Sequence, residues 1–182
     1  MIKNLVIPLV MVWCILLTGC SNKHIDNEAL EEEFKNAPEW VLTGHEEGLF
    51  SAVGSAKIGK SGMQFAKTAA QGRNELARQL SVKVEFLVNN FVQQTGIAKD
   101  QLAKQVSRQV THETLNGFHQ KDVWISPGSE LYVLVFMETN GVKQSIRNQV
   151  ISSYQKQAGD WQRFQAQNAD EELDRELEKA FK

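Results

Sequence analysis

One cysteine near the N-terminus stands in a context that favours covalent modification of its sulfur. It ends the sequence Leu17-Thr18-Gly19-Cys20, which follows a positive charge at Lys3 and an apolar run from Leu5 to Leu17. Small residues before such a cysteine are typical of the bacterial lipobox, in which the sulfur receives a diacylglyceryl group before the signal peptide is cleaved. The apolar run is too short to span a bilayer as a stable helix. We therefore predict a signal peptide over residues 1–19 and lipid attachment at Cys20, with an ordinary signal peptide or an uncleaved anchor as the alternative.

Cleavage at this position would make Cys20 the first residue of the mature protein, acylated by palmitate-type chains on sulfur and on nitrogen. Each buried CH₂ contributes about 0.8 kcal/mol, and two chains already suffice for stable anchoring. Ser21 follows the cysteine in place of an aspartate, which favours sorting to the outer membrane of a Gram-negative cell. We expect a lipid-anchored outer-membrane protein whose domain faces either the periplasm or the cell surface. Cys14 would leave with the signal peptide, so no disulfide framework is available.

A second motif could bind phosphate. Residues Gly54 to Ser61 read Gly-Ser-Ala-Lys-Ile-Gly-Lys-Ser, which satisfies G-x-x-x-x-G-K-S between an expected strand and an expected helix. Glu138 ends another apolar strand and could help to hold Mg²⁺. The alternation of side chains continues past Gly54, however, which indicates that this glycine lies inside the strand. We interpret the match as incidental, with Gly54 and Ala56 allowing close packing against a neighbouring element.

The remaining chemistry-bearing residues show no catalytic pattern. The 4 histidines, His24, His45, His112 and His119, lack the spacing of metal ligands, and no G-x-S-x-G nucleophile elbow is present. The paired carboxylates Glu46 and Glu47 lie in a polar loop. Three tryptophans, Trp40, Trp124 and Trp161, could form a sugar-stacking or partner surface, but tryptophans scattered in this way are more often core residues. We therefore predict no catalytic, cofactor-binding or metal-binding residues, no cofactor and no enzymatic activity.

Length and composition favour one globular domain with extensions. The chain has 182 residues, of which 42% are hydrophobic and 23% charged, and its net charge of -2 gives no case for nucleic acid as a partner. We expect four segments: a lipoprotein signal peptide (1–19), a lipidated tether with a short helix (20–37), a globular α+β domain (38–159) and an acidic C-terminal helix (160–182).

The element that organises this domain is a long amphipathic helix from Met63 to Gln94. Ser61 is its expected N-cap, with Gln64 at the capping-box spacing, and Gly96 is expected to close its C-terminus. Its apolar positions recur every three or four residues, which predicts one buried stripe. The stripe consists of Ala66, Ala69, Ala70, Leu76, Ala77, Leu80, Val84, Leu87, Val88 and Phe91. Because the stripe begins with small residues, the N-terminal half can lie close to a backbone, and a sheet is the expected partner.

The other elements predict the fold class. Strands are expected over Leu49–Ala56, Asp122–Ser126 and Glu130–Thr139, and the last two are joined by the turn dipeptide Pro127-Gly128. Further helices are expected over Glu28–Lys35, over Asp100–Leu115, over Val142–Gln157 with Asn140 as cap, and from Trp161 onward after a break at Gly159-Asp160. Since strands and helices do not alternate and a hairpin is present, we predict an α+β fold with an antiparallel sheet of about three strands packed by the long helix, with helical extensions at both ends.

The composition of the last strand indicates that a further element or another chain packs on the sheet. Leu131 to Met137 is apolar on both faces, and the long helix can cover only one of them. A C-terminal ladder of Leu173, Leu177 and Phe181 could cover the other face, either from the same chain or from a neighbouring copy. We therefore expect a homo-oligomer.

Four short segments carry a family resemblance. They are Ala-Pro-Glu-Trp-Val (37–41), Ala-Val-Gly-Ser-Ala (52–56), Gly-Arg-Asn-Glu-Leu-Ala (72–77) and Leu-Tyr-Val-Leu-Val (131–135). In this order after a lipobox, they resemble the small twenty-kilodalton (Lpp-twenty type) lipoprotein family over about residues 20–150. The chain departs from that pattern at Gly72, where an alanine is expected, and in its longer acidic C-terminal helix.

The resemblance implies a non-enzymatic protein of the bacterial envelope, because the family includes outer-membrane lipoproteins associated with flagella and motility. We expect a structural or assembly role, with a flagellar association as its more specific form. The alternative is a regulatory binding module that acts on a periplasmic cell-wall enzyme. The expected partners are the membrane, through acyl chains on Cys20, and envelope or flagellar proteins.

Overall fold

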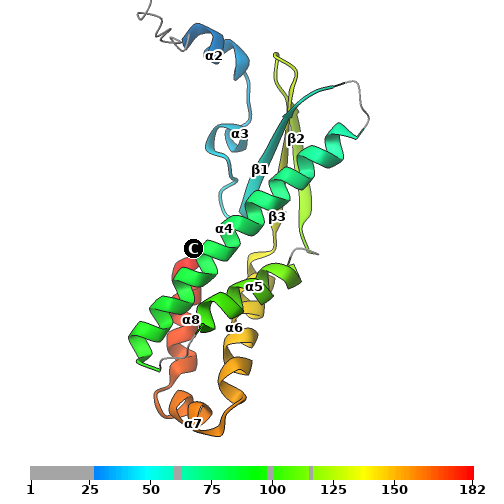
Figure 1. Cartoon of the computed structure of the whole chain (residues 1–182). Helices are drawn as coiled ribbons and strands as arrows, with labels where there is room; N and C mark the ends of the chain where they lie inside the picture. Colours follow the sequence, from blue (N-terminus) through cyan, green and yellow to red (C-terminus); the bar gives the residue numbers. More distant parts are fainter. Residues whose placement is uncertain (1–26, 60–62, 98–100, 115–116) are drawn as a thin grey trace, which may run out of the picture. The chain divides into compact units, whose positions relative to one another are not determined.

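The computed structural model describes residues 27–59, 63–97, 101–114 and 117–182. The chain divides into two compact units, residues 1–32 and residues 33–182. The helix α2 (Asn27–Glu33) crosses this boundary and corresponds to the short helix expected over Glu28–Lys35. All other described elements belong to the second unit, which combines helices with one sheet (Figure 1).

The sheet of the second unit has three antiparallel strands in the order β1-β3-β2. The strands are β1 (Phe50–Lys57), β2 (His119–Ile125) and β3 (Glu130–Met137). The expected α+β fold class and the hairpin at Pro127-Gly128 are confirmed. β2 begins earlier than expected, because a register shift between Gln120 and Asp122 lets pairing continue back to His119.

The long helix α4 (Gln64–Thr95) packs against β1 and β3, as expected (Figure 1). Gly96 adopts a left-handed conformation with φ of 62°, and its N–H donates to the carbonyl oxygen of Val92, which closes the helix. The expected cap Ser61 lies outside the described residues. Met63 directly precedes the helix and makes no side-chain cap bond.

The buried stripe of α4 differs from the expected one in its first half. Ala66 is exposed, whereas Thr68 and Gly72 are buried. Their burial has a physical reason: Thr68 donates its hydroxyl to the carbonyl oxygen of Gln64, so a polar side chain can face the sheet without an unpaired donor. From Leu76 onward the expected apolar residues line the core, except that Ala77 is only half-buried.

Two glycines bring α4 and β1 into backbone contact. A Cβ atom on Gly72 would lie 2.9 Å from the backbone nitrogen of Gly54 and 3.0 Å from a methyl group of Val135. A Cβ atom on Gly54 would overlap the carbonyl oxygen of Thr68 and lie 2.6 Å from the backbone nitrogen of Gly72. Because neither position has room for a side chain, the helix rests directly on the strand.

The C-terminal half of α4 is surrounded by helices. These are α5 (Leu102–Thr114), α6 (Thr139–Gln155), α7 (Ala158–Ala166) and α8 (Ala169–Ala180) (Figure 1). Asn140 is not the cap of α6, because the helix begins one residue earlier, at Thr139, with Glu138 in extended conformation before it. The next break falls at Gln157, so Gly159 and Asp160 lie in the first turn of α7 instead of between helices.

The ends of this helical half are fixed by aromatic contacts. The Tyr154 ring is fully buried between Phe91 and Phe164, with centroid distances of 6.2 and 5.1 Å. Its hydroxyl donates to the carbonyl oxygen of Ile97 at 2.8 Å. Burial, with a smaller contribution from the Asp160 carboxylate, raises the pKa of Tyr154 to about 12. The hydroxyl therefore stays protonated and can donate this bond at every physiological pH.

The C-terminal ladder packs within its own chain. α8 lies against α4, where Leu173 and Leu177 are buried, and the Phe181 ring lies edge-on to the Phe50 ring at 5.8 Å. The ladder therefore does not cover the outer face of β3, by which we mean the face turned away from α4. Covering that face was one of the roles expected for the ladder. Neither α4 nor any other helix of the described ranges is long and apolar enough to cross a membrane.

Candidate functional site

The phosphate-binding motif lacks the geometry that it requires. Gly54 lies inside β1, where it pairs with Val133 of β3, as the alternation of side chains predicted. A phosphate loop would need this glycine at the start of a loop with its N–H groups open to an anion. Instead it is buried against the backbone of α4. Lys60 and Ser61, the last two residues of the motif, lie outside the described residues.

The candidate lipid-attachment residue Cys20 also lies outside the described residues, but the structure shows where the chain enters the second unit. The carboxylate of Glu33 accepts a hydrogen bond from the backbone nitrogen of Gly128 at 2.8 Å and another from the Ser126 hydroxyl. A Cβ atom on Gly128 would lie 2.7 Å from one carboxylate oxygen, so a glycine allows this close approach. Glu33 therefore fixes the start of the unit to the turn of the β2–β3 hairpin.

Residues that follow Glu33 cover the outer face of β3. The Phe34 ring stacks on the Trp124 ring at 6.5 Å and meets the Tyr132 ring edge-on at 6.3 Å. In α3 (Glu39–Thr43), Trp40 is buried, and its indole N–H donates to the Asp122 carboxylate at 3.1 Å. Burial raises the pKa of Tyr132, and nearby carboxylates add to the shift. This face is thus covered within the chain by the segment before β1, a contact that the spacing of apolar residues does not predict.

The contacts also decide the role of two tryptophans. Trp40 packs on the sheet and is only 7% exposed, so its interpretation as a buried residue is confirmed. Trp124 of β2 is half-buried, with its ring 5.4 Å from that of Tyr132, and is not one of the buried core residues. Trp161 is partly buried and stacks on Phe164 at 5.3 Å. None of the three stands free as a sugar-stacking platform.

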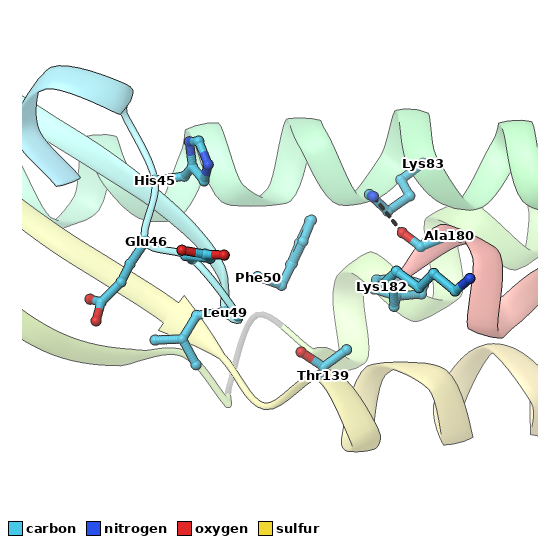
Figure 2. A pocket seen from close by; sticks show the side chains of 11 residues that line it. His45, Glu46, Leu49, Phe50, Lys83, Thr139, Ala180 and Lys182 are labelled. Carbon is cyan, nitrogen blue, oxygen red and sulfur yellow. Dashed lines mark hydrogen bonds between the residues drawn. The ribbon is translucent and has the colours of Figure 1, made fainter. Parts of the chain in front are cut away.

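A hollow of about 240 Å³ lies where β1, α4 and α8 meet. Figure 2 shows its lining: His45, Glu46 and Leu49 from the loop before β1, Phe50 from the strand, Lys83 from α4, Thr139 from α6, and the residues after α8. Its volume lies below the roughly 300–1,000 Å³ that is usual for small-molecule pockets. A ligand of metabolite size would therefore not be enclosed here.

Two of the charged groups around this hollow, Lys83 and Glu46, make structural bonds. Lys83 donates from Nζ to the carbonyl oxygen of Ala180 at 2.6 Å, near the C-terminus of α8, as the dashed line in Figure 2 shows. The same Nζ lies 5.3 Å from the centroid of the Phe181 ring, within the range of a cation–π contact. Glu46 forms an ion pair with Lys121 of β2. Lys83 therefore holds the end of α8 against α4, and Glu46 ties the loop to the sheet.

The histidines are dispersed. His45 lies in the loop after α3, with its Nδ1 3.1 Å from the carbonyl oxygen of Thr43. His112 is on α5, and His119 begins β2, with its ring 5.5 Å from that of Phe136. His24 lies outside the described residues. Within the parts of the chain that the structure describes, no three His, Cys, Asp or Glu side chains gather as a metal site would require.

Comparison with known families gives a match over the part of the chain that contains the sheet. The model of a family described as LPP20 lipoprotein matches residues 38–138, more than half of the chain. The matched segment runs from the residue before α3 to the residue after β3, so it contains the whole sheet together with α4 and α5. The helices α6, α7 and α8 lie beyond it. No curated protein matches the sequence.

Proposed function

Because the chain belongs to the LPP20 lipoprotein family, we propose that it is an outer-membrane lipoprotein, held by acyl chains on Cys20, with a non-enzymatic structural or assembly role in the envelope. The observation that carries this proposal is the sequence Leu17-Thr18-Gly19-Cys20, which directly follows an apolar run in a chain whose folded unit matches a lipoprotein family. The more specific form of the proposal is a role at the flagellum.

The fold supports a role in which the folded domain is kept at the membrane by its lipid anchor and acts through its position. Residues 33–182 form a compact unit with its own core, and this unit begins 13 residues after Cys20. Lys83 and Glu46, which line the hollow beside β1, fix the end of α8 and the loop before β1. An arrangement of this kind supports positioning or assembly better than turnover of a substrate.

We also propose that the protein self-associates. In the order β1-β3-β2, the strands β1 and β2 each have one edge without a strand partner among the described residues. Exposed edges can pair with a strand of another chain. Analytical ultracentrifugation of a soluble version that starts after Cys20 tests this: self-association is expected, and a monomer at tens of micromolar, roughly the range where weak dimers form, would contradict it.

The lipid anchor is tested by metabolic labelling with a palmitate analogue. The wild-type protein should be labelled and should fractionate with the outer membrane, whereas Cys20→Ala should be unlabelled and released from it. Cys14→Ala is the matched control, because that thiol lies in the apolar part of the signal peptide and should leave labelling intact. Equal labelling of Cys20→Ala and wild type would refute the anchor.

A role at the flagellum is tested separately, by the swimming motility of mutant strains. A strain in which Cys20→Ala replaces the wild-type copy should lose swimming in soft agar if the anchored domain serves the flagellum. Normal swimming of a strain that lacks the protein altogether would exclude the flagellar role and leave the anchor unaffected.

A further inference from the structure

Four large apolar side chains are exposed at one end of the second unit. We call them the tip residues: Ile58, 42% exposed, Met63, 76%, Phe65, 41%, and Ile125, 55%. They come from the segment after β1, from the start of α4 and from the end of β2. In Figure 1 these three places lie together at the end of the sheet that is remote from α7. Exposed apolar residues gathered at one place on a protein mark an interaction surface more often than residues exposed singly.

Hydrogen bonds hold this end together. The backbone nitrogen of Ile58 donates to the carbonyl oxygen of Ser129 at 2.8 Å, which joins the end of β1 to the hairpin turn. The Gln64 side chain donates to the carbonyl oxygen of Lys57 at 2.7 Å, which joins the start of α4 to the same place. The segments that carry the tip residues are therefore joined to one another by hydrogen bonds.

The chain enters the folded unit at this same end. Glu33 is bound to Ser126 and Gly128, in the turn that directly follows Ile125. Cys20 precedes Glu33 by 13 residues. An extended chain covers at most about 3.4 Å per residue and a helix about 1.5 Å, so with α2 helical the link reaches no further than roughly 35 Å. An acylated Cys20 would therefore keep Glu33, and the hairpin turn that it binds, within that distance of the bilayer, which holds this end of the unit nearest to the membrane anchor.

We propose that the tip residues form a membrane-contact surface, which rests on the lipid bilayer that receives the acyl chains of Cys20. This inference rests on the proposed lipid anchor and adds to it an orientation of the domain. Because the anchor makes contact with the bilayer an intramolecular event, a few apolar side chains suffice where an untethered protein would dissociate.

The charge around the tip fits a lipid surface. Lys57 and Lys67 are exposed beside the tip residues, and lysines near a bilayer are attracted to anionic headgroups. Within the second unit, the Glu130 carboxylate is half-buried opposite Lys57 in the sheet, and the Glu33 carboxylate is engaged with the hairpin turn. Lys57 and Lys67 therefore supply exposed positive charge at the tip.

The test uses the full mature lipoprotein, reconstituted into vesicles of phosphatidylethanolamine and phosphatidylglycerol. Its only thiol is the one introduced, because Cys14 leaves with the signal peptide and the sulfur of Cys20 carries lipid. An environment-sensitive NBD label is placed at Phe65→Cys or at Ile125→Cys. The matched control is Val82→Cys, which is 61% exposed on α4 about 26 Å further along the helix.

The expected result is a blue shift of NBD emission and quenching by acyl-chain-brominated lipids at both tip labels, with neither change at the control label. Tip labels that behave like the control, in protein that still floats with the vesicles, would overturn the membrane-contact surface and leave the anchor intact. Protein that does not float with the vesicles would overturn the anchor itself, and the orientation with it.

Discussion

Replacing Gly72 by alanine tests the packing of α4 on the sheet. In an open helix this change is favourable, since alanine is a better helix former than glycine by about 1 kcal/mol. Here the new methyl group would lie 2.9 Å from the backbone nitrogen of Gly54 and 3.0 Å from a Val135 methyl group. Forcing extra atoms into a well-packed place costs typically about 1–3 kcal/mol. We therefore expect a net loss of roughly 0–2 kcal/mol in the free energy of unfolding.

Gly141→Ala is the matched control, because Gly141 lies in α6 and a Cβ atom there meets nothing within 4 Å. It should leave stability unchanged or raise it by up to about 1 kcal/mol. Urea denaturation followed by circular dichroism, on a soluble version that starts after Cys20, gives both values from the midpoints at constant m-value. If Gly72→Ala were as stabilising as Gly141→Ala, the backbone contact between α4 and β1 would be wrong.

Further changes test other contacts of the fold. Tyr154→Phe removes the bond to the carbonyl oxygen of Ile97 and should cost about 1 kcal/mol near neutral pH. Because the pKa of Tyr154 is higher in the folded state than in the unfolded state, the free energy of unfolding of the wild type should fall as the pH rises from about 10 to about 12. This fall should be smaller in Tyr154→Phe. Equal pH dependence of the two proteins in urea melts at alkaline pH would contradict the raised pKa of Tyr154. Trp40→Phe should lower stability by about 1–2 kcal/mol through loss of the bond to Asp122, and an unchanged melting curve would count against that bond. Lys60→Ala should leave folding and cellular function unchanged, whereas micromolar ATP binding that this change abolishes would restore the phosphate-loop interpretation.

The periodicity of apolar residues predicted those helices and strands that bury a regular face of their own. The second half of the α4 stripe, the alternation through β1 and the apolar run of β3 each have one or two buried faces, and the spacing of side chains alone reveals them. In the first half of α4 the spacing was misleading, because Thr68 and Gly72 are buried while Ala66 is exposed. The break between α6 and α7 was misplaced because Gly159 was taken as the interruption. Glycine costs a helix only about 1 kcal/mol, and it is tolerated in the first turn of α7.

Contacts between distant segments could not be predicted in this way. The Glu33 carboxylate meets Ser126 across 93 residues, and Lys83 meets Ala180 across 97 residues. No local pattern marks such partners, so the cover of the outer face of β3 was assigned to the C-terminal ladder when Phe34 and Trp40 provide it. The departure at Gly72 was visible in the sequence, and the close packing predicted at Gly54 is confirmed, but no local pattern showed that these two glycines face each other.

The candidate lipid site differs from both cases. The signal around Cys20 is a short linear pattern, so the sequence is sufficient to predict it, and the described part of the fold adds only the place where the tether joins the domain.

The mature protein is proposed to begin at an acylated Cys20, and mass spectrometry of the N-terminal peptide from membrane-purified protein tests this most directly. We predict a peptide that starts at Cys20 and carries the added mass of a diacylglyceryl group and an N-linked acyl chain. A mature N-terminus at any other residue, or an unmodified Cys20, would contradict the account.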